Sequence, residues 1–192
     1  LVPGEQIRQQ ETAEYAGVSR IPLREALNIL ARQGVLVHKP NQGFFVAKRT
    51  PAEVAQLRRM LHLLENEVLG SLNWPEPGEL ERLRQLNERM HALTHAQDWS
   101  EVPLLNREFH NTILQLSPHH LIVREIMHLY MLIDPLFGPK FEQAAERAKR
   151  VQEHEAIIQA LELRNRTTLM SVIADHRYPE GVGFAPEGER AE

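Results

Sequence analysis

The hydrophobic positions of the first fifty residues follow a helical spacing and then a strand-like one. Gly17 separates two helical stretches, and Ser19, a favourable N-cap residue, precedes a second helix that ends before Gly34. A turn-rich segment then lies between two short strand-like runs. The expected elements are helices at 7–16 and 20–33 and strands at 35–38 and 44–47. This order predicts a winged helix-turn-helix, with a small β-hairpin as its wing, over residues 1–49.

The second of these helices has two distinct faces when its residues are placed at 100° per position. An apolar stripe is formed by Leu23, Ala26, Leu27 and Leu30. A polar stripe about 110° away is formed by Arg20, Arg24 and Asn28. One face can therefore pack against the rest of the unit while the other stays free to contact an anionic partner.

The chain after residue 49 has helical periodicity and no strand signal. Thr50 and Glu53 form a capping box at the start of a helix that breaks at residues 74–78. The helices expected beyond it are 79–96, 101–116, 121–134, 141–164 and 168–177. The fold class is thus mainly α, with an all-α six-helix bundle over residues 50–177. Residues 178–192 are rich in Gly, Pro and Glu and predict a disordered tail.

Charge is distributed unevenly along this chain of 192 residues. Residues 1–49 carry seven Lys and Arg against four Asp and Glu, so the remainder carries 15 against 22. A basic head on an acidic body is typical of a protein that meets a polyanion at one end. The chain has no cysteine, no membrane-length apolar run and no signal-peptide pattern at its start, which favours a cytoplasmic protein with no membrane partner.

The polar stripe and the hairpin suggest contacts with duplex DNA. A helix in the major groove needs cationic or amide side chains near its N-terminus, and a glycine at a hairpin tip allows close approach of the backbone. The candidate contacts are Arg20, Arg24, Asn28, Lys39 and Gly43. By spacing alone, Arg20 and Arg24 could equally be ordinary solvated helix residues.

Three histidines and one asparagine fall on or beside apolar helix faces in the second half of the chain. Asn106 and His110 are four residues apart and point the same way, and His154 and His176 lie among aliphatic positions of later helices. An unpartnered imidazole in a core is costly. Either each histidine is hydrogen-bonded in the core, or the four side chains converge on a divalent ion.

The head closely resembles the GntR superfamily of bacterial regulators. The resemblance lies in G-V-S-R-I-P-L-R-E-A-L from residue 17 to 27, followed by Leu30, by Gly34 and Val35, and by G-F-F-V from residue 43. It implies that Arg20 and Arg24 contact DNA from the recognition helix and that Gly43 does so from the wing. A further family arginine is replaced here by Gln10. The chain also begins after the position of the family's first helix, which we therefore expect to be missing.

The helical part resembles the metal-binding subgroup of the FadR-like branch of that superfamily. That subgroup has D/N-x-x-x-H on one helix, then a histidine, then another about 22 residues later. The resemblance implies a metal site made by Asn106, His110, His154 and His176, in which Asn106 replaces the usual Asp. Three imidazoles and an oxygen favour Zn²⁺ or Ni²⁺, with Mn²⁺ as a further candidate.

The same resemblance implies a small carboxylate as effector, completing the coordination of the metal. An arginine common in the first helix of such domains is Leu61 here. The candidate effector contacts are Arg58, His62, Arg124 and His128.

The main hypothesis is therefore a homodimeric, repressor-type regulator that binds a palindromic DNA operator and answers to metal and carboxylate. One alternative makes the metal itself the signal. A His-ligated metalloenzyme is disfavoured because the sequence has no His-Glu-x-x-His run and no general base beside the ligands, so we expect no enzymatic activity.

Overall fold

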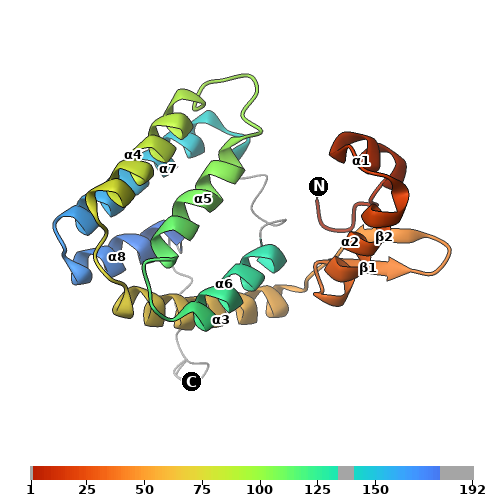
Figure 1. Ribbon diagram of the computed structural model, residues 1–192, viewed down its shortest axis with the longest axis horizontal. Coiled ribbons are helices and arrows are strands. Elements are labelled where there is room, and N and C mark those ends of the chain that lie inside the picture. The colour runs from red at the N-terminus through yellow and green to blue at the C-terminus, as the bar shows by residue number, and fades with distance from the viewer. Residues whose placement is uncertain (1, 134–140, 178–192) are drawn as a thin grey trace, which may run out of the picture. The chain divides into compact units, whose positions relative to one another are not determined.

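The computed structural model describes residues 2–133 and 141–177 of the chain. Within them it has helices and a single two-stranded hairpin (Figure 1). In chain order these are α1 (Gln9–Ala16), α2 (Arg20–Arg32), β1 (Leu36–Lys39), β2 (Gly43–Val46), α3 (Pro51–Ser71), α4 (Pro77–Ala92), α5 (Val102–Leu114), α6 (His120–Ile133), α7 (Ala144–Glu162) and α8 (Arg166–Arg177). The expected fold class is confirmed, whereas the predicted tail at 178–192 lies outside the described residues.

The chain forms two compact units. Of the described residues, one unit comprises 2–57 together with 128–133, and the other comprises 58–127 together with 141–177. We refer to α1, α2 and the hairpin as the head, and to residues 58–127 and 141–177 as the helical unit. The division at residue 49 that the sequence suggests remains a prediction.

The head is built around one side of α2. Leu23 and Leu27 of α2 are buried with Phe44 and Val46 of β2 in a small core. Ala26 was also expected on this face, but it is exposed, so the buried stripe is narrower than predicted. The strands pair antiparallel, from Leu36 opposite Val46 to Lys39 opposite Gly43.

The segment before α1 covers the outer edge of the hairpin, a feature that the sequence analysis missed. Gly4 N–H donates to the Val46 carbonyl at 2.9 Å and Ile7 N–H donates to the Phe44 carbonyl at 2.8 Å. These bonds satisfy backbone groups of β2 that an open edge would leave without a partner.

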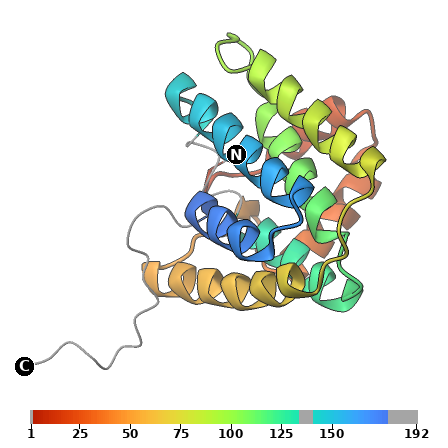
Figure 2. The ribbon, with the colours of Figure 1, turned by 90° about the vertical axis from the view of Figure 1, so that its left-hand side faces the viewer.

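The helical unit packs α4 against both α5 and α7, and α7 against α8 (Figures 1 and 2). Leu83, Phe109, Ile157 and Leu169, one from each of these helices, are completely inaccessible to solvent and belong to one continuous core. Because α5, α7 and α8 share this core, any polar side chain on their inner faces is placed in an apolar environment.

Local hydrogen bonds set the start of two helices and the end of one. The Thr50–Glu53 capping box is present, with Thr50 N–H donating to Glu53 at 2.7 Å. A second capping box, between Glu76 and Glu79, starts α4 two residues earlier than predicted, with Pro77 in its first turn. The helix ends at Ala92 instead of residue 96 because the following residues form tighter turns.

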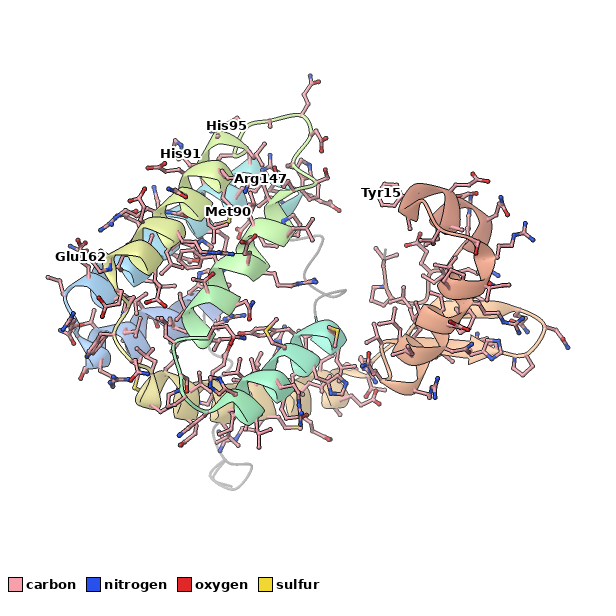
Figure 3. The ribbon with its side chains drawn as sticks, in the orientation of Figure 1. Tyr15, Met90, His91, His95, Arg147 and Glu162 are labelled. Carbon is pink, nitrogen blue, oxygen red and sulfur yellow. The ribbon has the colours of Figure 1, made fainter. Side chains whose placement is uncertain are left out.

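A buried arginine fixes the loop between α4 and α5 (Figure 3). Arg147 of α7 donates to the carbonyl oxygens of Thr94 and Glu142, both at 2.9 Å, and its guanidinium lies over the Trp99 ring. In the same figure His91 and His95, at the C-terminal end of α4 and just beyond it, are exposed. No helix in the described part of the chain is long and apolar enough to span a membrane.

Two neighbouring leucines of α5 test this packing. Leu105 is 2% exposed and Leu104 is 61% exposed. Leu105→Ala should lower the free energy of unfolding by about 2–5 kcal/mol because it leaves a cavity in the core, whereas Leu104→Ala should change it by less than about 0.5 kcal/mol. Urea denaturation of both variants measures the difference, and equal effects would contradict the assigned faces of α5.

Candidate metal centre and nucleic-acid interface

The helical unit brings together three histidines that are far apart in the sequence. His110 comes from α5, His154 from α7 and His176 from the last turn of α8. One ring nitrogen from each lies within 4.8 Å of the other two. All three side chains are buried, His154 completely. Convergence of the three histidines, which the sequence analysis expected, is therefore present in the structure.

The imidazoles have fewer hydrogen-bond partners than they have nitrogens. His110 Nε2 and His176 Nε2 are 2.9 Å apart, so one donates to the other. Neither nitrogen of His154 has a partner among the described residues, and its ring is stacked on Phe109 with the centroids 4.0 Å apart. Since buried polar atoms are nearly always paired, His154 is the side chain that most needs an additional ligand.

Asn106 lies one turn before His110 on α5. Its Oδ1 is buried and has no hydrogen-bond partner in the described part of the chain, although the residue is partly exposed. Residues four apart on a helix are neighbours, so Asn106 and His110 lie on the same side of α5. An unpartnered carbonyl oxygen there is consistent with the predicted fourth ligand.

Two arginine–carboxylate pairs adjoin the cluster, and the sequence analysis missed both. Glu153 accepts from Arg150 at 2.9 Å and lies 2.7 Å from His176 Nδ1. Arg177, next to His176, is 3.4 Å from the buried carboxylate of Glu65 on α3. The only signal for the first pair was its i, i+3 spacing on α7, which is equally typical of a solvated ion pair.

Burial keeps the pKa of His110, His154 and His176 well below the usual 6.5 of histidine. Loss of solvation disfavours the imidazolium form, and the positive charges of Arg177 and Arg150 disfavour it further. The three rings are therefore neutral at pH 7. Only a neutral imidazole has a lone pair for a metal ion, so none of the three rings has to lose a positive charge before it binds one.

The residues fit a divalent ion. Bonds of 2.0–2.1 Å to a tetrahedral zinc place imidazole nitrogens about 3.3 Å apart. The nitrogens here lie within 4.8 Å, so small side-chain rotations suffice to bring them to that separation. An ion at this point would give a partner to Asn106 Oδ1 and to one of the two unpartnered nitrogens of His154.

The four predicted effector residues lie on α3 and α6. Arg58 and His62 lie on α3, with His62 3.0 Å from Asn66. Arg124 is largely exposed and pairs with the adjacent Glu125, and His128 belongs to the other compact unit. Contact of these four residues with an effector stays a prediction.

The predicted DNA contacts gather at the start of α2. Arg20 and Arg24 are exposed on its first two turns, whereas Leu23 and Leu27 are buried. Arg20 donates from Nε to Gln10 Oε1 at 2.7 Å, and its Nη2 contacts the same oxygen. Gln10, at the position of a family arginine, therefore holds the guanidinium of Arg20 from α1.

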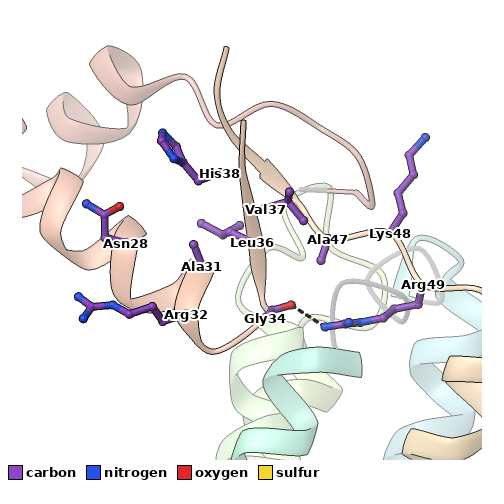
Figure 4. Close-up of a pocket in the computed structure, with 10 residues that line it drawn as sticks. All are labelled: Asn28, Ala31, Arg32, Gly34, Leu36, Val37, His38, Ala47, Lys48 and Arg49. Atoms are coloured by element: carbon purple, nitrogen blue, oxygen red, sulfur yellow. Dashed lines mark hydrogen bonds between the residues drawn. The ribbon is translucent and has the colours of Figure 1, made fainter. Parts of the chain in front are cut away.

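Asn28 lies further along α2, beside a shallow basic hollow in the head (Figure 4). Arg32, Lys48 and Arg49 also line this hollow, and Arg49 donates to the Gly34 carbonyl. These three cations were not among the predicted DNA contacts. No acidic side chain is among the described residues that line it.

Lys39 and Gly43 flank the hairpin turn. Lys39 Nζ lies 4.6 Å from the centroid of the Phe45 ring, so the lysine is folded back along the wing. Gly43 has a φ of 95°, a conformation that side chains rarely adopt. Backbone conformation is thus a sufficient reason for glycine at this position.

Two protein-family models match the chain. The model described as bacterial regulatory proteins, gntR family, matches residues 1–46, and the FCD domain model matches residues 72–177.

Curated relatives and solved structures give the same picture. The HTH-type transcriptional regulator YdhC of Bacillus subtilis strain 168 is 26% identical over 178 residues, which cover 91% of this chain and 79% of that protein. The regulator McbR of Escherichia coli K12 is 25% identical over 91% of this chain and 80% of its own. The structure of E. coli McbR/YncC has a TM-score of 0.79 at 23% identity and covers 92% of this chain and 85% of that one. These relatives are regulators and not enzymes.

The depressed pKa of the histidines makes the metal-free protein sensitive to acid. Below about pH 6.5 the unfolded chain takes up protons at these residues while the folded chain does not, so the free energy of unfolding falls as the pH is lowered. Each histidine contributes up to about 1.4 kcal/mol per pH unit. Urea denaturation between pH 7.5 and 5, with a chelator present, measures this slope.

His154→Phe should make that slope shallower, because it removes one of the buried imidazoles and keeps an aromatic ring against Phe109. His91→Gln is the matched control, since His91 is exposed in the folded protein. A slope that is the same in all three proteins would show that the cluster does not stay neutral.

Proposed function

The chain belongs to the FCD-domain family of GntR-type bacterial transcriptional regulators, and we propose that it binds a divalent metal ion through His110, His154 and His176. The metal would in turn hold a small carboxylate effector that modulates DNA binding. The observation that carries this proposal is His154, whose two nitrogens are buried without a partner beside two other imidazoles.

The donor set supports a metal and limits its identity. Burying an imidazole without hydrogen bonds costs free energy, and a metal ion recovers that cost at His154 and Asn106 together. Three imidazoles with one neutral oxygen favour Zn²⁺ or Ni²⁺ over ions that prefer carboxylates, and Mn²⁺ is a weaker candidate.

The charge balance supports an anionic effector. None of the four proposed ligands is charged, so a divalent ion keeps its +2 charge. The adjoining pairs, Arg150 with Glu153 and Arg177 with Glu65, are each neutral overall. A carboxylate would offset the remaining positive charge and complete the coordination of the ion.

The head supports recognition of duplex DNA. Arg20 and Arg24 are exposed on the leading turns of α2, the end of a recognition helix that meets base edges. A single head offers few base contacts, so we propose that two copies of the chain bind a palindromic site as a homodimer. We also propose that the protein represses transcription when it binds near a promoter.

A metal sensor is the second candidate function, favoured by the neutrality of the ligand set. With no carboxylate among the proposed ligands, the ion itself produces the largest change of charge in the helical unit. In that case the metal alone would alter DNA affinity, and a carboxylate would add nothing.

Metal uptake by the purified, chelator-treated protein tests the site. We expect about one Zn²⁺ or Ni²⁺ per chain by isothermal titration, with the ion content checked by elemental analysis. His154→Ala should lower the affinity by at least about 100-fold, because it removes a ligand and not merely a supporting group. His95→Ala, at an exposed histidine, should bind as the wild type does. A wild-type protein that takes up no metal refutes this part of the proposal.

DNA recognition is tested on a duplex selected by the wild-type protein from a random-sequence pool. Arg24→Ala should weaken binding to that duplex by about 1–3 kcal/mol, because a base contact is lost. Arg82→Ala, at an exposed arginine of α4 that pairs with Glu108, is the control and should bind normally. Unchanged binding by Arg20→Ala/Arg24→Ala would contradict the assignment of α2 as the recognition helix.

The same binding assay separates the two candidate functions. Affinity for the selected duplex is measured with no metal, with Zn²⁺, and with Zn²⁺ plus acetate, succinate or citrate. A change that requires a carboxylate supports an effector receptor, and a change produced in full by Zn²⁺ alone supports a metal sensor.

A further inference from the structure

We infer that Glu153 is a positioning residue, which fixes the tautomer of His176 so that its Nε2 carries the lone pair for the metal. The inference rests on the proposed metal site but concerns a residue that is not itself a ligand. It follows from the contacts on the two sides of the His176 ring.

The side of the ring away from the cluster faces a carboxylate. Glu153 Oε2 lies 2.7 Å from His176 Nδ1, and the His176 side chain is almost fully buried. A carboxylate can only accept a hydrogen bond, so the proton of the neutral ring is on Nδ1. Arg150 donates to the same carboxylate oxygen at 2.9 Å and keeps its charge balanced.

The opposite side of the ring faces the cluster. With the proton on Nδ1, His176 Nε2 is left with a lone pair and accepts from His110 Nε2 at 2.9 Å. This lone pair is the one that a metal would take. Carboxylates that accept from the distal nitrogen of a ligating histidine fix its orientation and make it more basic.

Arg150 is a second neighbour of His176 Nδ1, and it favours the opposite tautomer to Glu153. Its Nη1 lies 3.3 Å from His176 Nδ1 and also donates to the His176 carbonyl oxygen. Without Glu153, the neighbour left at Nδ1 is a donor, which would favour a lone pair on Nδ1 and move the proton to Nε2. The ring would then present an N–H to the metal site.

The position of His176 explains why it needs such support. It lies in the last turn of α8, where backbone carbonyls have no partner within the helix. Glu153 and Arg150, both on α7, hold the side chain and the carbonyl of this residue. The helix that carries the ligand His154 therefore also orients the ligand on its neighbour.

The inference is tested by the substitution Glu153→Met, which removes the acceptor and keeps a side chain of similar length. Nitrogen-15 NMR of the metal-free protein, labelled at histidine, reports which ring nitrogen of His176 carries the proton. We expect the proton on Nδ1 in the wild type and on Nε2 in the variant. Zn²⁺ affinity should fall by about 10–100-fold in the variant.

Two further variants serve as controls. Glu153→Gln keeps an acceptor oxygen and should restore the Nδ1 proton and most of the Zn²⁺ affinity. Glu155→Met, at an exposed glutamate two residues away on the same helix, should behave as the wild type.

The possible results are distinguishable. A wild-type His176 protonated on Nε2 overturns the inference even if Glu153→Met does not fold. Unchanged tautomer and Zn²⁺ affinity in a folded Glu153→Met protein also overturn it. If the wild type binds no Zn²⁺, the proposed metal site fails, but the NMR result still decides the role of Glu153.

Discussion

The helical unit has one unmet requirement for hydrogen bonds: three imidazoles are buried together in an apolar core, and His154 has no partner among the described residues. His154 has no hydrogen bond at either nitrogen, and His110 and His176 share a single bond between their Nε2 atoms. A core of aliphatic residues would be more stable in itself than one with an unpaired imidazole. The arrangement is favourable when a cation takes the free lone pairs, and the proposed function follows from this.

The residues around the cluster keep the histidines neutral and correctly oriented for binding a cation. Burial and the arginine charges keep the rings neutral, and thus able to bind a metal. Phe109 holds the plane of the His154 ring, and Glu153 sets the proton of His176. The pair formed by Glu65 and Arg177 connects α3 with the end of α8 beside the site.

Sequence periodicity predicted the elements and the faces on which the key residues lie, because both depend on local spacing. The apolar surroundings of His110, His154 and His176 could be read from neighbouring aliphatic positions, and so could the exposed Arg20 and Arg24. Periodicity could not predict which side chains on different helices contact one another. Glu153 looks like any surface glutamate on α7 until α8 is placed beside it, and Gln10 becomes a partner of Arg20 only when α1 packs on α2. Ala26 belongs to the predicted apolar stripe but is exposed, because helical spacing shows which residues share a face and not which of them another element covers.

X-ray absorption spectroscopy of the Zn²⁺-loaded protein is the most direct test of the central claim, because it reports the atoms bound to the ion. Three imidazole nitrogens at about 2.0–2.1 Å are expected, with oxygen in the remaining positions. A shell made of oxygen alone, or one unchanged in the His154→Ala protein, would contradict the claim that the buried histidines bind the metal.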